Sequence, residues 1–146
     1  MTSRPDPTSS LDVLRHAPHV VIHTVGFAAA RLPEMIAYTE LRDRGAAARP
    51  EIDALLRTGS PSGRVYAALL LEALDAEEGR KAWASLANDP EVTSIHPGGC
   101  LPFFPTTVGA FASAVLESGG AAEALTTGDT PPWARPELES DPAREP

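Results

Sequence analysis

Apolar side chains recur with the 3.6-residue period of an α-helix through the middle of the chain. Pro33 fits the first turn of a helix whose apolar positions continue at helical spacing until Gly45, which is placed to stop it. Pro50 opens a second helix of the same kind, and Gly59 follows it as a C-terminal cap. Because only a few residues join the two helices, we expect them to form an antiparallel hairpin.

The next predicted helix is the centre of the fold. Ser60 and Pro61 form a helix cap followed by proline at the first helical position. The run 65–71 is apolar on every face, as a helix buried on all sides requires. Arg64 and Glu72 are the charged residues of this helix and lie on one face. Both can pair with groups on neighbouring helices, Arg64 can equally face solvent, and the sequence does not decide between these arrangements.

Two further helices follow from capping residues. Asp75 can cap a helix that ends before Pro90. Thr106 or Thr107 can cap the last helix, in which apolar residues again recur at helical spacing.

Other segments have a weaker helical pattern. Ser10 can cap a short helix that Pro18 ends. Residues 19–32 combine a valine-rich half that favours a strand with an alanine-rich half that favours a helix; since no neighbouring strand is evident, we predict a helix. Residues 91–105 contain three prolines, which predicts a long ordered loop with a short extended piece at 92–95.

These patterns predict a compact all-α domain of five or six helices in antiparallel hairpins, spanning residues 10–118. We expect residues 1–9 to be a flexible leader and residues 119–146 to be an acidic, proline-rich, disordered tail. The tail contains six acidic residues and two arginines, so it carries −4 of the formal charge of −8.

Composition narrows the class of protein. Apolar residues make up 42% of the chain and charged residues 22%, which is typical of a globular domain. No stretch approaches the ~18 apolar residues of a membrane span, and the first residues lack the apolar region of a secretion signal; we therefore expect a cytoplasmic protein with no membrane partner. The net charge of −8 repels polyanions, so we expect no nucleic-acid partner. Lys81 is the single lysine among twelve basic residues, which with the abundant alanine favours a bacterial coding bias.

The order of helices and breaks over residues 33–90 resembles the paired helices of HEAT-type repeat proteins. The breaks that carry this resemblance are Gly45, Gly59, Ser60 and Asp75, each between two predicted helices. HEAT-like proteins generally act as binding surfaces, so the resemblance implies a scaffold without catalytic chemistry. It carries over no functional residue.

All four histidines and the single cysteine fall into two clusters. His16, His19 and His23 lie near the start, and His96 and Cys100 lie in the proline-rich segment. Imidazole and thiolate are ligands that zinc prefers, but the spacing matches no known zinc signature. We therefore predict no cofactor, with a zinc site at His19, His23, His96 and Cys100 as the alternative. Surface histidines and a small buried thiol are the commoner roles of such residues.

Cys100 also suggests nucleophilic chemistry. His96 lies four residues before it as a candidate base, and the backbone N–H groups of residues 98–100 can form an anion-binding nest. A lone cysteine is more often a core contact than a nucleophile. A small metal- or thiol-dependent enzyme that uses His96 and Cys100 is therefore the alternative function.

Aromatic residues provide candidates for binding. Phe103 and Phe104 lie between two prolines, and they form either a lid over the core or an exposed recognition patch. Together with Arg64 and Tyr66 they are our candidate binding residues. We favour a non-enzymatic protein-interaction or accessory module, immunity-like in character, whose partner is another protein.

Overall fold

The computed structural model describes residues 7–21, 32–96 and 104–121. The elements of these ranges, in chain order, are α1 (Pro7–Arg15), β1 (Val20–Val21), α2 (Pro33–Arg44), the 3-10 turn η1 (Gly45–Ala48), α3 (Arg49–Thr58), α4 (Pro61–Leu74), α5 (Ala76–Leu86), β2 (Val92–His96), β3 (Phe104–Thr107) and α6 (Val108–Ser118).

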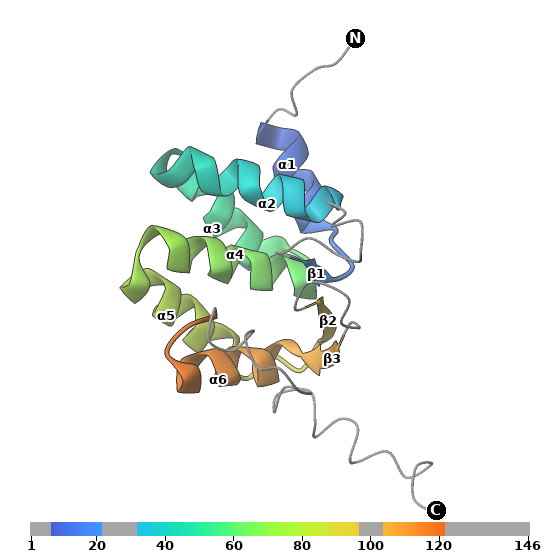
Figure 1. Cartoon of the computed structure of the whole chain (residues 1–146), viewed down its shortest axis with the longest axis vertical. Helices are drawn as coiled ribbons and strands as arrows, with labels where there is room; N and C mark the ends of the chain where they lie inside the picture. Colours follow the sequence, from blue (N-terminus) through green and yellow to red (C-terminus); the bar gives the residue numbers. More distant parts are fainter. Residues whose placement is uncertain (1–6, 22–31, 97–103, 122–146) are drawn as a thin grey trace, which may run out of the picture.

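Pairs of helices follow one another through the molecule. Figure 1 shows α1 and α2 at one end, α3 and α4 in the middle and α5 and α6 at the other end, with the strands along one side. Helix α4 contacts helices on both sides as well as β1 and β2. Its residues 65–71 are all buried, which confirms the prediction of a central helix surrounded by other elements.

Three of the predicted helix caps are confirmed atom by atom, whereas Ser10 is wrong as a cap because α1 begins at Pro7 and Ser10 lies inside it. The Ser60 hydroxyl accepts a hydrogen bond from the Gly63 N–H at 3.0 Å, at the start of α4. The Asp75 carboxylate accepts one from the Glu77 N–H at 2.8 Å, at the start of α5. Of the two threonines proposed for the last helix, Thr107 is the cap: its hydroxyl accepts from the backbone of α6.

The described residues are mostly helical, but they also contain a three-stranded sheet in the order β1-β2-β3. Strand β1 runs parallel to β2, with Val20 opposite Ile95 and Val21 opposite His96. Strand β2 runs antiparallel to β3. The all-α prediction is therefore confirmed only in part. The helix predicted over residues 19–32 is wrong at Val20 and Val21, because these β-branched residues find a partner strand far away in sequence.

The proline-rich segment is also corrected. The extended piece predicted at 92–95 is confirmed as β2, but the end of the segment forms strand β3 where a loop was predicted. The boundaries shift as well: α1 begins at Pro7, so residues 7–9 are helical instead of part of a leader, and the described structure continues past residue 118 to Ala121. Residues 1–6 and 122–146 lie outside the described residues.

The outer strands of the sheet have distinctive backbone partners. The Tyr66 hydroxyl of α4 accepts a hydrogen bond from the Val21 N–H at 2.7 Å and donates one to the Val21 carbonyl at 2.9 Å. On the other side, the Val108 N–H donates to the Glu91 carbonyl, so these two residues form a hydrogen-bonded pair of the β2–β3 ladder. Hydrogen-bonded and non-hydrogen-bonded pairs alternate along an antiparallel ladder, and by this alternation Pro105 belongs to a non-hydrogen-bonded pair. Its nitrogen, which carries no hydrogen, therefore faces away from β2.

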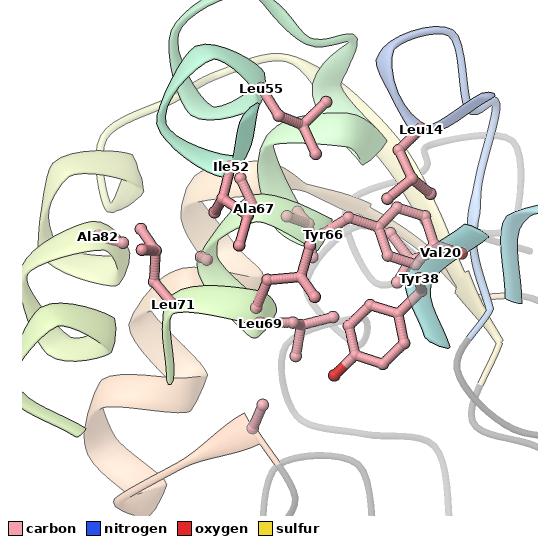
Figure 2. Packing of buried hydrophobic residues seen from close by; sticks show 14 of the residues in the cluster. Leu14, Val20, Tyr38, Ile52, Leu55, Tyr66, Ala67, Leu69, Leu71 and Ala82 are labelled. Atoms are coloured by element: carbon pink, nitrogen blue, oxygen red, sulfur yellow. The ribbon is translucent and has the colours of Figure 1, made fainter. Parts of the chain in front are cut away.

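The hydrophobic core lies around α4 and contains residues from the helices and from the sheet. Figure 2 shows Tyr66, Tyr38 and Val20 close together near one end of the core, and Leu71 and Ala82 together at the other. The ring centres of Tyr38 and Tyr66 are 5.8 Å apart. Burial raises the pKa of Tyr66 above its ordinary value, so the hydroxyl keeps the proton that it donates to Val21. In the described part of the chain, no helix is long and apolar enough to cross a membrane.

Candidate interaction groove

A groove of about 560 Å³ lies where α5 and α6 meet the end of α4. Its walls are Ala76, Arg80 and Trp83 of α5, Val115 and Leu116 of α6, Gly119 and Gly120 after α6, and Glu72 of α4. The α5 residues recur at intervals of four and three, so they share one face of that helix.

Two local backbone features shape the groove. A Cβ atom on Gly79 would lie 2.4 Å from the Glu72 Cα, so α4 and α5 approach each other as closely as glycine allows. Gly119 has a φ of 88° and ends α6 in the left-handed conformation, with its N–H donating to the Val115 carbonyl. This turn brings the following Ala121 back towards α4, where it is buried.

The Glu72 carboxylate lies in the groove wall and joins three parts of the chain. Its Oε1 accepts a hydrogen bond from the Trp83 indole N–H at 2.8 Å. The Ala121 N–H lies 3.3 Å from each carboxylate oxygen. Trp83 is held in turn by an edge-to-face contact with Phe111 of α6, at 5.7 Å between ring centres.

The charge of Glu72 is not balanced by a cation in the described ranges. All its hydrogen-bond donors are neutral N–H groups, and the ion pairs among residues 7–21, 32–96 and 104–121 do not include it. Arg80 lies on the same groove and is exposed, and it too takes part in none of these ion pairs. Leu116 keeps 38% of its surface exposed at the groove wall. The groove thus combines apolar walls with one negative and one positive side chain.

The predicted zinc and thiol residues are only partly described. His96 is buried in β2 with 2% of its surface exposed. His19 precedes β1, and its Nε2 lies 3.9 Å from a Glu34 carboxylate oxygen. His23 and Cys100 lie outside the described residues. Within the described part no group of three or more His, Cys, Asp or Glu side chains could hold a metal ion.

The predicted binding residues Arg64 and Tyr66 have roles inside the fold. The Arg64 guanidinium donates to carboxylates of Asp89 and Glu91, each at 2.8 Å, and ties the start of α4 to the segment before β2. This settles the open question about Arg64: it pairs within the chain. Tyr66 is fully buried, so it belongs to the core and not to a binding surface.

Of the predicted binding residues Phe103 and Phe104, the described residues include Phe104. Phe104 is half-buried and packs against the core, which agrees with the lid alternative. Phe103 lies outside the described residues.

Sequence reasoning did not identify the groove. The sequence pattern indicated only Glu72, as a charge in an otherwise apolar helix. A carboxylate in an otherwise apolar helix was the signal that could have drawn attention to it.

Comparison of the chain with protein-family models, with curated protein sequences and with solved structures finds no match.

Proposed function

We propose that this chain is a non-enzymatic protein-interaction module, and that the groove between α5 and α6 binds a segment of another protein. The observation that carries the proposal is the groove itself: the partly exposed Leu116 and its neighbour Val115 line a recess of about 560 Å³. Exposed apolar surface next to a recess is typical of recognition sites, and binding sites of a few hundred Å³ are usually largely preformed.

The rigidity of the walls supports this proposal. Trp83 is fixed by its hydrogen bond to Glu72 and by its ring contact with Phe111. Gly79 has no side chain, so α5 packs directly against the backbone of α4 at Glu72. A docking surface that is already in place loses less conformational entropy on binding, so more of the contact energy appears as affinity.

The arrangement of helices is part of the same proposal. Successive helix pairs, which resemble HEAT-type repeats, are an architecture that commonly presents surfaces to partner proteins. We propose an accessory role of this kind, immunity-like in character, in a bacterial cytoplasm.

The test is site-specific photo-crosslinking in the cell that produces the chain. A photoreactive amino acid replaces Leu116 in the groove, and in the control it replaces Val92, which is 68% exposed on β2. We expect one partner to be captured from Leu116 and not from Val92. The purified partner should then bind the wild-type chain in a defined ratio.

Variants with a charge at each position complete the test. Leu116→Asp should weaken binding of the purified partner at least ~10-fold, because a buried unpaired charge is costly at an interface. Val92→Asp should leave the affinity within about twofold. Equal effects of the two variants, or capture of the same proteins from both positions, would reject the groove as the docking surface.

A further inference from the structure

We infer that the groove selects a partner segment that carries a lysine or arginine next to its apolar anchor, and that this cation pairs with the Glu72 carboxylate. The inference rests on the proposed function and specifies the chemistry of the segment that the groove accepts.

The hydrogen bonding of Glu72 leaves room for such a cation. An ionised carboxylate has about four lone-pair sites. Trp83 donates to Oε1 at 2.8 Å, whereas Oε2 has as its donor the Ala121 N–H, shared with Oε1 at 3.3 Å. Oε2 is therefore the less satisfied of the two oxygens and the natural acceptor for an additional, charged donor.

The electrostatic setting also favours a cation. Glu72 is half-buried, and in such a setting a charge interacts more strongly with its partner than it would in open solvent. Its donors stabilise the charge without neutralising it, so a partner's ammonium or guanidinium group would supply the missing positive charge. The chain as a whole carries −8, which steers basic segments towards it and acidic ones away.

Arg80 defines where the cation can lie. It lies on the α5 wall of the same groove but is exposed and makes no ion pair with Glu72. It therefore repels a second cation from its own side of the groove. The anchor's apolar side chain then lies against Val115 and Leu116, and its basic neighbour is directed to Glu72.

The test uses short fluorescent amphipathic peptides as probes of the full chain. One probe is built from leucine and lysine, and the others have glutamine, glutamate or ε-acetyl-lysine in place of each lysine. Fluorescence polarisation should show that the lysine probe binds about 10-fold more tightly than the glutamine and acetyl-lysine probes, and that the glutamate probe binds more weakly still.

Two charge-neutralising variants separate Glu72 from the general field of the chain. Glu72→Gln keeps an oxygen that can accept from Trp83 but removes the charge, and it should lower the affinity for the lysine probe about 10-fold. Glu117→Gln removes the same charge from an exposed position of α6 and should change it less than about twofold. Circular dichroism checks that both variants are folded. The acetyl-lysine probe tests the wild-type chain directly, so the result does not depend on the stability of Glu72→Gln.

Several outcomes would overturn the inference, and they separate it from the proposed function. If the lysine, glutamine and acetyl-lysine probes bind equally and Leu116→Asp weakens all of them, the groove is a docking site without a cation requirement. If no probe binds, both the cation requirement and docking of apolar segments are refuted. Crosslinks from Leu116 to residues 122–146 of the same chain, or to a second copy, would assign the groove to that occupant instead.

Discussion

Replacing Tyr66 by phenylalanine removes one oxygen atom from the centre of the molecule. The ring and its contacts remain, so the variant creates almost no cavity. The lost hydroxyl serves both the N–H and the carbonyl of Val21, and both residues are fully buried. Water therefore cannot easily replace it, and two backbone groups lose their partner at once.

The magnitude follows from those two groups. Leaving one buried donor or acceptor without a partner costs about 1–3 kcal/mol, so Tyr66→Phe, which leaves two, should lower the free energy of unfolding by about 2–6 kcal/mol. A typical domain is stable by about 5–15 kcal/mol, so the loss should be plain in urea denaturation followed by circular dichroism. Hydrogen exchange of the Val21 amide should also become faster.

Tyr38→Phe is the matched control. It removes the same atom from the neighbouring ring, whose centre is 5.8 Å from that of Tyr66. Its hydroxyl interacts with the exposed Arg42, so its loss should cost less than about 1 kcal/mol. If the two variants differ by less than about 0.5 kcal/mol, the two bonds to Val21 do not stabilise the fold and the reasoning is refuted.

Three other outcomes are expected from the same structure. Burial raises the pKa of Tyr66 and of Tyr38 above the ordinary value of about 10. The tyrosines of the unfolded chain therefore ionise at lower pH than those of the folded chain. The stabilisation is complete below pH ~10 and falls above it, by at most ~1.4 kcal/mol per pH unit for each tyrosine. Urea denaturation at a series of pH values measures this loss. Gly79→Ala places a Cβ atom 2.4 Å from the Glu72 Cα and should lower the free energy of unfolding by about 2 kcal/mol or more. Asp75→Ala removes the cap of α5 and should cost about 1 kcal/mol in the same assay.

Matched variants control these measurements. Lys81→Ala changes an exposed residue two positions after Gly79, and Asp43→Ala removes an exposed acid that caps no helix; each should stay within about 0.5 kcal/mol of the wild type. If Gly79→Ala is as stable as Lys81→Ala, α4 and α5 can separate at no cost. If Asp75→Ala matches Asp43→Ala, the cap makes no net contribution. A Tyr66→Phe chain that loses as much stability above pH 10 as the wild type would contradict the assignment of the alkaline effect to Tyr66.

The helices could be predicted because their signals are local. Ser60, Asp75 and Thr107 each bond a backbone N–H two or three residues further along the chain, so the sequence alone locates the start of the helix. The valine-rich sequence around β1 favours a strand, but it does not show that a partner strand exists. Val20 becomes extended because Ile95 lies beside it, and a window of neighbouring residues contains nothing of that partner.

The groove could not be predicted for the same reason. Glu72 meets Trp83 eleven residues away and Ala121 forty-nine residues away, and the second contact depends on the left-handed turn at Gly119. From the sequence, Glu72 was a charge that can pair with a group on a neighbouring helix. Which partner it finds is decided by how α5 and α6 pack, and hydrophobic periodicity does not contain that information.

The hydrogen bonds of Val21 and the position of Pro105 affect the tendency of the protein to aggregate at high concentration. A strand at the margin of a sheet can recruit a strand from another molecule when its backbone groups are free. Here the Tyr66 hydroxyl already occupies both groups of Val21, and Pro105 has no N–H to offer on the opposite margin. Within the described residues, both margins of the sheet therefore resist templated aggregation.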